Sequence, residues 1–202
     1  MRQDIAFHAG EAVSQKIIGK LLSDYFDAVL TVDPHLHRIK HLSEAIPTGQ
    51  ALALYATTAM SAFIKEKIDN PVIIGPDEES LQWVEAIAKT DQWQYSIANK
   101  QRFGDRDVAV TLGDIHLTNR NVVIVDDIAS SGRTLEQTVK QLVPQKPQSI
   151  SIMVTHAFFV DDAIARLHAL GVTNIWSSDS VLHSTNAFSV IEILAGALKT
   201  SA

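Results

Sequence analysis

The segment from Val122 to Leu135 constrains the fold of this chain more than any other. It reads Val-Val-Ile-Val-Asp-Asp-Ile-Ala-Ser-Ser-Gly-Arg-Thr-Leu. Four apolar residues indicate a buried strand of a parallel sheet, and Asp126 and Asp127 stand where that strand is expected to end. Small and hydroxylic residues follow, and from about Arg133 the apolar spacing becomes that of a helix. The segment therefore predicts a strand, a tight loop and the start of a helix.

A loop of this kind can bind an anion, because unpaired amide N–H groups and the helix dipole converge on it. Two carboxylates beside such a cradle suit a sugar phosphate, since the amides hold the phosphate and the carboxylates hold ribose hydroxyls. The alternative is a plain strand-to-helix turn whose acids cap the helix. A Walker loop is not expected, because Gly132-Arg133-Thr134 stands in place of its Gly-Lys-Ser/Thr.

Composition narrows the class of protein. At 202 residues the chain is long enough for one large or two small domains. Its 17 basic and 23 acidic residues give a net charge of −6, which argues against a general nucleic-acid binder. The absence of cysteine excludes a disulfide framework and a thiol nucleophile. We find no signal-peptide core and no uncharged stretch long enough to span a bilayer, so a soluble cytoplasmic protein is expected.

Strand-like and helix-like segments alternate, which predicts an α/β fold with a mainly parallel sheet. Residues 99–107 are polar and basic with one glycine, and they predict a mobile loop. The expected strands are 28–32, 71–74, 94–97, 108–111, 122–125, 149–154 and 173–176. The expected helices are 11–24, 51–67, 79–89, the segment from Arg133, 161–170 and 187–198.

Several expected strands are followed by acids or histidines, among them Asp33, His35, Asp77 and the Asp126–Asp127 pair. Ligands of open α/β sheets bind at the carboxyl ends of the strands. These side chains can therefore converge on one crevice. Asp77 has a second interpretation of equal weight, as an ordinary helix N-cap.

The acidic segment resembles the phosphoribosyl-pyrophosphate (PRPP) motif of type I phosphoribosyltransferases and PRPP synthetases. The resemblance implies that one stretch binds ribose 5-phosphate or PRPP. Its members here are Asp126, Asp127, Ala129, Ser130, Ser131, Gly132, Arg133 and Thr134.

Other segments resemble PRPP synthetases in the same order, from Met1 to about Leu198. The Arg-Gln-Asp start implies that Arg2 and Gln3 bind ATP. The Asp-Pro-His element implies that His35 lies by the Mg-ATP, and Gly-Pro-Asp implies that Asp77 lies near the metal. The basic segment resembles the catalytic lid of the family, which implies catalytic roles for Lys100 and Arg102, with Arg106 in the same loop.

The resemblance implies a phosphoribosyltransferase-type open, mainly parallel sheet flanked by helices, with an incomplete second similar domain. Residues 47–183 would form the complete domain, and 1–46 with 184–202 a remnant of the other. The chain would then be a fragment or a short homologue, with a sheet edge exposed at 28–32. The implied reaction moves a diphosphoryl group from ATP to ribose 5-phosphate with Mg²⁺, in a homo-oligomer.

Two other functions use the same cradle. One is a phosphoribosyltransferase that consumes PRPP. The other is a non-catalytic partner or regulatory homologue that binds a sugar phosphate and no longer binds ATP.

Overall fold

The structure is a computed structural model that describes residues 3–36, 38–103, 107–111 and 115–201. Within residues 99–111 only the backbone is described. The chain divides into two compact units, each of which we describe by itself. Unit 1 comprises Met1–Ala56 and Val190–Ala202, and unit 2 comprises Thr57–Ser189.

Unit 2 is an α/β domain built on strands that alternate with helices. Its elements before the acidic segment are α3 (Thr57–Lys67), β3 (Val72–Gly75), the 3-10 turn η1 (Glu78–Ser80), α4 (Leu81–Asp91), β4 (Gln94–Ile97), β5 (Asn99–Phe103) and β6 (Asp107–Thr111). The remaining elements are β7 (Asn121–Ala129), α5 (Arg133–Leu142), η2 (Val143–Gln145), β8 (Ser149–Ala157), α6 (Ala163–Ala169), β9 (Val172–Ser178) and β10 (Asn186–Phe188).

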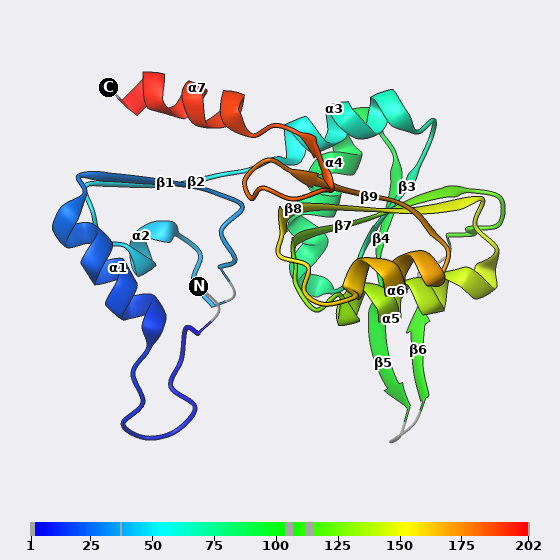
Figure 1. The fold of residues 1–202 in the computed structure, drawn as a ribbon, viewed down its shortest axis with the longest axis horizontal. Coiled ribbons are helices and arrows are strands. Elements are labelled where there is room, and N and C mark those ends of the chain that lie inside the picture. The colour runs from blue at the N-terminus through cyan, green and yellow to red at the C-terminus, as the bar shows by residue number, and fades with distance from the viewer. Residues whose placement is uncertain (1–2, 37, 104–106, 112–114, 202) are drawn as a thin grey trace. The chain divides into compact units, whose positions relative to one another are not determined.

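Six strands of unit 2 form one parallel sheet in the order β10-β9-β8-β7-β3-β4 (Figure 1). From β3 the chain moves outward to β4, whereas from β7 it moves outward in the other direction through β8, β9 and β10. The direction therefore reverses between β3 and β7. In open α/β sheets the crevice outside the carboxyl ends of the strands at this reversal is the usual place for a ligand.

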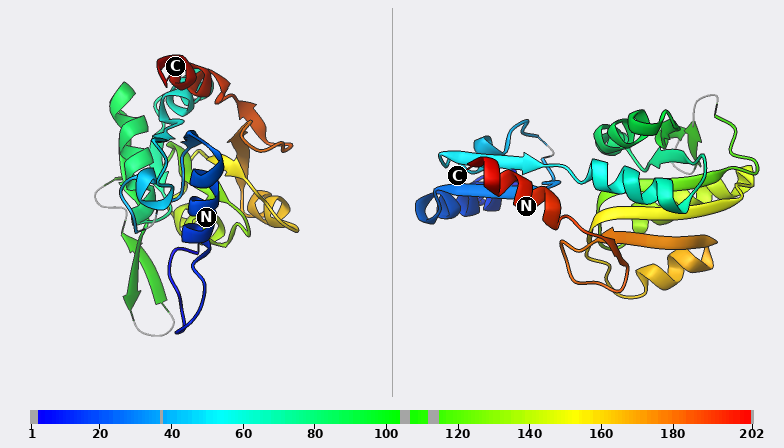
Figure 2. Two further views of the ribbon diagram at one scale, coloured as in Figure 1. Left: turned by 90° about the vertical axis from the view of Figure 1, so that its left-hand side faces the viewer. Right: turned by 90° about the horizontal axis from the view of Figure 1, so that it is seen from above.

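Helices cover both faces of this sheet, with α3 and α4 on one face and α5 and α6 on the other (Figure 2). The central strand β7 serves both faces because its alternate residues point to opposite sides. Val122 and Ile124 belong to the fully buried cluster that includes Leu135 and Val139 of α5. The acids that follow these residues are thus carried by a strand that is buried in the domain core.

The basic segment is a β-hairpin over its described length, not the loop that its composition predicts. β5 pairs antiparallel with β6, and Lys100 and Arg102 lie opposite Val110 and Val108. The valine-rich partner strand favours this pairing over the polar character of β5. The hairpin projects from the body of unit 2 (Figure 1).

Unit 1 is a small parallel ribbon with helices on both faces (Figure 1). Its elements are α1 (Ser14–Tyr25), β1 (Ala28–Val32), α2 (Leu42–Ala45), β2 (Gln50–Leu54) and α7 (Ile191–Ser201). β1 and β2 pair in parallel, from Ala28 beside Gln50 to Val32 beside Leu54. The prediction of one helix over 51–67 was therefore wrong in its first part, because pairing with β1 makes a strand of an alanine- and leucine-rich stretch.

The core of unit 1 is small. It consists of Leu42, Ala45 and Ile46 with partly buried neighbours from α1, β1 and β2. None of the helices in the described ranges has the length and apolar composition of a membrane span.

Candidate functional site: acids and amides at the carboxyl ends of β3 and β7

The acidic pair lies inside β7, not beyond its end. The strand runs to Ala129 because Asp126 pairs with Val154 of β8 and Ile128 with His156. Asp127 is almost fully buried and Asp126 is partly buried. The backbone N–H of Asp127 donates a 3.0 Å hydrogen bond to the Asp126 carboxylate. The acids are thus held by the sheet and are not on a free loop.

Burial raises the pKa of the Asp126 carboxyl well above its usual value, and the charges of Asp127 and Asp77 raise it further. The carboxyl groups of Asp127 on β7 and of Asp77 after β3 therefore both act on Asp126. A raised pKa means that ionised Asp126 is disfavoured in the free protein. Hydrogen-bond donors or a cation placed beside it would favour its ionised form.

Asp77 follows β3 on the other side of this gap, and its side chain caps the helical segment that comes next. One carboxylate oxygen accepts hydrogen bonds from the backbone N–H groups of Glu79 and Ser80, at 3.1 Å and 3.3 Å. The capping interpretation is therefore present in the structure. Metal binding by Asp77 stays a prediction that uses its remaining capacity as an acceptor.

The predicted phosphate cradle follows β7, and hydrogen bonds to four consecutive carbonyl groups set its geometry. The Ala129 carbonyl accepts from the Phe158 N–H at 2.8 Å, and the Ser130 carbonyl accepts from the Val160 N–H at 3.2 Å. The Ser131 carbonyl accepts from the Arg166 guanidinium at 2.9 Å. The Gly132 carbonyl accepts from the N–H of Glu136 at 2.8 Å, which begins the hydrogen bonding of α5.

In a trans peptide the C=O and the following N–H point in opposite directions, and the described peptides are all trans. Because these four carbonyls are bonded within the protein, the four N–H groups that follow them point the other way. Over the described part of the chain, the amides of Ser130, Ser131, Gly132 and Arg133 have no hydrogen-bond partner. They form a row of donors at the N-terminus of α5, which is where an anion binds.

The cradle needs a residue that can adopt a left-handed backbone conformation at position 132, and Gly132 provides it. Its φ of 72° lies in the left-handed region, and it is the N-cap residue of α5. A Cβ at this position would lie 3.3 Å from the Cβ of Ala163. The loop therefore needs glycine for both its backbone angle and its closeness to α6.

The remaining predicted cradle residues lie in the same stretch. Ala129 is buried, Ser130 and Thr134 are partly exposed, and Ser131 and Arg133 are exposed. All eight residues predicted to bind ribose 5-phosphate thus lie in one continuous stretch, from the end of β7 to the first turn of α5. Their contact with a sugar phosphate stays a prediction.

The predicted catalytic residues are placed by backbone alone. Lys100 and Arg102 lie two residues apart in β5, and their side chains fall outside the described part of the chain. Arg106 lies outside the described residues altogether, as does Arg2.

The other predicted ATP ligands lie in unit 1, where Gln3 has a structural role. Its amide oxygen accepts from the backbone N–H of Ser14 at 2.7 Å and from the Ser14 hydroxyl. Its amide nitrogen donates to the Ala12 carbonyl at 2.6 Å. These bonds tie the segment before α1 to the first turn of that helix, so ATP binding by Gln3 stays a prediction.

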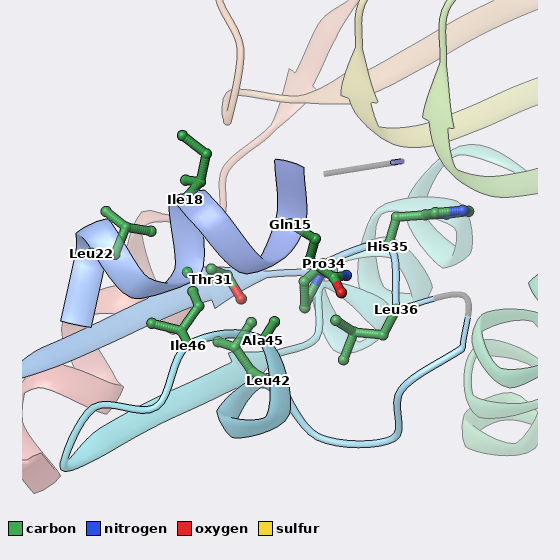
Figure 3. Close-up of a pocket in the computed structure, with 11 residues that line it drawn as sticks. Gln15, Ile18, Leu22, Thr31, Pro34, His35, Leu36, Leu42, Ala45 and Ile46 are labelled. Carbon is green, nitrogen blue, oxygen red and sulfur yellow. The ribbon is translucent and has the colours of Figure 1, made fainter. Parts of the chain in front are cut away.

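His35 lies at a hollow of unit 1 whose volume is about 170 Å³ (Figure 3). The hollow is lined mainly by apolar residues, including Leu22, Leu42 and Ile46, and its polar lining residues include Gln15. The His35 ring points away from the apolar side chains (Figure 3).

Asp33, two residues before His35, is buried and joins the ends of two strands. Its N–H donates to the Leu54 carbonyl at 2.8 Å, and its carboxylate accepts from the Ala56 N–H at 3.2 Å. His35 and Asp77 belong to different units, so their joint metal site stays a prediction. Among the described residues there is no group of three or more His, Cys, Asp or Glu side chains that could hold a metal ion.

The sequence alone did not predict two residues of the site. Arg166 and Glu136 form an ion pair of 2.7 Å behind the cradle. Arg166 lies 35 residues beyond Ser131, the residue whose carbonyl it holds. No local sequence signal links residues so far apart, because their contact depends on how α6 packs on α5.

The fold and this strand–cradle–helix site together define a protein of the phosphoribosyltransferase class. The phosphoribosyl transferase domain family matches residues 43–174, which confirms the predicted fold class. Sequence relatives identify one family within this class. A ribose-phosphate pyrophosphokinase from Archaeoglobus fulgidus is 30% identical over 201 residues, which is 96% of this chain and 69% of the relative. The chain belongs to the ribose-phosphate pyrophosphokinase family.

Further similarities agree with this assignment. A ribose-phosphate pyrophosphokinase from Pyrococcus abyssi is 32% identical over 177 residues, which is 86% of this chain and 61% of the relative. The crystal structure of phosphoribosylpyrophosphate synthetase from Mycobacterium smegmatis has the same fold, with a TM-score of 0.80 at 19% identity. The match covers 99% of this chain and 67% of that one. The chain thus spans roughly two thirds of the length of these proteins.

Proposed function

We propose that this chain takes part in the transfer of a diphosphoryl group from ATP to ribose 5-phosphate, which forms PRPP. The observation that carries the proposal is the row of four N–H groups from Ser130 to Arg133 beside the Asp126–Asp127 pair. The amides hold the 5-phosphate, and the carboxylates accept hydrogen bonds from ribose hydroxyls. The names of the sequence relatives support this choice of reaction.

Mg²⁺ fits the chemistry of this site. It prefers oxygen ligands and is commonly held by one or two carboxylates together with substrate phosphates. Asp77, which follows β3, and His35 are the proposed protein ligands, and the raised pKa of Asp126 supports a region that favours added positive charge. When bound, the ion supplies charge neutralisation for the transferring phosphoryl groups.

The donor half of the reaction is assigned to residues outside the cradle. Arg2, Gln3 and His35 are the proposed ATP contacts. Lys100 and Arg102 are proposed to stabilise the negative charge of the transferred group, because phosphoryl transfer needs fixed cations on its oxygens. The proposed setting is a cytoplasmic homo-oligomer. Unit 2 corresponds to the complete domain of the family, and unit 1 to part of the second domain.

The test incubates the protein with ATP, Mg²⁺ and ribose 5-phosphate and measures AMP. Release of AMP that depends on ribose 5-phosphate supports the proposal. Lys100→Ala should lower turnover while leaving the affinity for ribose 5-phosphate unchanged. Asp127→Ala should weaken that affinity by roughly 1–3 kcal/mol, the cost of a lost charged hydrogen bond. No AMP at high protein concentration would refute activity of this chain.

A second function is favoured by one observation. The Gln3 amide bonds to Ser14 and Ala12, so these groups would compete with ATP for it, whereas the amides of the cradle have no such competitor among the described residues. A non-catalytic subunit would bind ribose 5-phosphate or PRPP without ATP, and calorimetry with each ligand separates it from the enzyme. Pyrophosphate release from PRPP with a nucleobase would instead identify a phosphoribosyltransferase.

A further inference from the structure

Arg166 of α6 contacts the cradle from behind. Its Nη2 donates to the Ser131 carbonyl at 2.9 Å, and its Nε donates to the Glu136 carboxylate at 2.7 Å. The guanidinium also forms an ion pair with Asp162, the N-cap residue of α6. One side chain therefore connects the cradle, α5 and α6.

The bond to Ser131 differs from the other bonds that orient the cradle. The carbonyls of Ala129, Ser130 and Gly132 are held by backbone N–H groups, which every non-proline residue provides. The Ser131 carbonyl is held by a side chain. Because the peptide is planar, fixing this carbonyl also fixes the direction of the Gly132 N–H. The orientation of the Gly132 N–H thus depends on the Arg166 side chain, which a substitution can remove.

Glu136 makes this arrangement rigid. Its side chain is 14% exposed and accepts from Arg166, while its backbone N–H donates to the Gly132 carbonyl. The peptides on both sides of Gly132 are therefore tied to the Arg166–Glu136 pair. A planar guanidinium can donate to a carbonyl and a carboxylate at once in fixed directions, which an ammonium on a flexible stem does poorly.

We propose that Arg166 is a positioning residue for phosphate binding. It holds the Ser131–Gly132 peptide so that the Gly132 N–H faces the phosphate, and it does this from the carbonyl side of the loop. The proposal rests on the proposed function, because it assumes that the cradle binds a phosphate group. Its direct consequence is that hydrogen-bond geometry at Arg166, and not charge alone, controls phosphate affinity.

The experiment measures the binding of ribose 5-phosphate and of inorganic phosphate by calorimetry. Arg166→Gln removes both the charge and the planar guanidinium. Arg166→Lys keeps the charge but loses the paired donors of the guanidinium. Both should weaken ribose 5-phosphate binding about ten-fold, which corresponds to about 1.4 kcal/mol. Arg120→Gln is the matched control. Arg120 also holds a backbone carbonyl of unit 2, that of Asn70, but it lies at the amino end of β7, so affinity should stay within about two-fold.

A second readout requires no ligand. The amide resonance of Gly132 should shift in Arg166→Lys and not in Arg120→Gln, while the thermal midpoints report on overall stability. Affinity in Arg166→Lys equal to that of the unaltered protein would overturn the proposal, because charge would then suffice. An unshifted Gly132 resonance in that variant would overturn it as well. If the unaltered protein binds neither ligand, the proposed function fails, and the Gly132 resonance still tests the positioning.

Discussion

Replacement of Gly132 by alanine should damage both stability and ligand binding, and the structure separates the two causes. The φ of 72° places residue 132 in the left-handed region. A residue with a Cβ pays about 1–2 kcal/mol to adopt this conformation. The added Cβ would also lie 3.3 Å from the Cβ of Ala163 and 3.8 Å from Cδ1 of Leu167, so α6 must move slightly away.

Gly171 provides a matched control in the same domain. Its φ is 96°, and a Cβ there would meet nothing within 4 Å. Gly171→Ala therefore carries the backbone cost without the packing cost. We expect a loss of about 1–2 kcal/mol in Gly171→Ala and about 2–4 kcal/mol in Gly132→Ala. For a chain of this size the thermal midpoint falls by about 2–4 °C per kcal/mol.

The assays are urea unfolding and calorimetric titration with ribose 5-phosphate. Gly132→Ala should lose most of its affinity, because a relaxed loop no longer aligns the N–H groups on either side of Gly132. Gly171→Ala should bind as the unaltered protein does. Equal affinity in the two variants would refute the assignment of the cradle as the phosphate site. Equal losses of stability would refute the packing argument at α6.

Three further changes test other parts of the structure. Burial raises the pKa of Asp126 above its ordinary 3.8, so the folded state binds more protons than the unfolded state above about pH 4, and its stability falls as pH rises through the raised pKa. In Asp126→Asn the free energy of unfolding, measured with urea at several pH values, should no longer show this fall. Parallel pH profiles for the variant and the unaltered protein would contradict the prediction. The Thr31 hydroxyl is buried without a hydrogen-bond partner among the described residues. Thr31→Val should therefore raise the free energy of unfolding by about 1–2 kcal/mol, and a loss would contradict this. Gln3→Ala removes the bonds to Ser14 and should speed hydrogen exchange in the first turn of α1, at a cost of about 1–2 kcal/mol. Unchanged exchange there would show that Gln3 does not hold the helix.

The strand–loop–helix of the cradle could be predicted from sequence because its signals are local. Four apolar residues, a run of small residues and the helical spacing after Arg133 lie within one segment, and α5 does begin at Arg133. The expected strands 28–32 and 94–97 agree with β1 and β4 for the same reason. Short elements with clear boundaries need little information from elsewhere in the chain.

Predictions were wrong where pairing between distant segments decided the structure. Residues 50–54 are rich in alanine and leucine, but β1 lies beside them and makes them a strand. Residues 99–103 are polar, but β6 pairs with them. The strand at 122 extends through both acids because β8 continues alongside. Propensity within a segment does not contain this information.

The functional site shows the same limit. The row of N–H groups is directed by bonds from Phe158, Val160 and Arg166, which come from the next strand-to-helix connection and helix. The sequence motif therefore predicts which loop would bind the phosphate. What orients the loop becomes visible only when α6 is packed against α5.

The two halves of the site place opposite demands on a ligand, which gives a final prediction. The buried Asp126 beside Asp127 favours hydrogen-bond donors, whereas the amides from Ser130 to Arg133 favour an acceptor with negative charge. Inorganic phosphate can satisfy only the amides, and ribose only the carboxylates. Ribose 5-phosphate joins both groups in one molecule, so its second contact forms at high effective concentration.

Calorimetry should therefore show that ribose 5-phosphate binds at least about ten-fold more tightly than inorganic phosphate, and far more tightly than ribose. Asp127→Ala should reduce this advantage and leave the affinity for inorganic phosphate nearly unchanged. If phosphate alone binds as tightly as ribose 5-phosphate, the carboxylates do not contact the sugar. The pair of acids would then have to be explained by another role, such as cation binding.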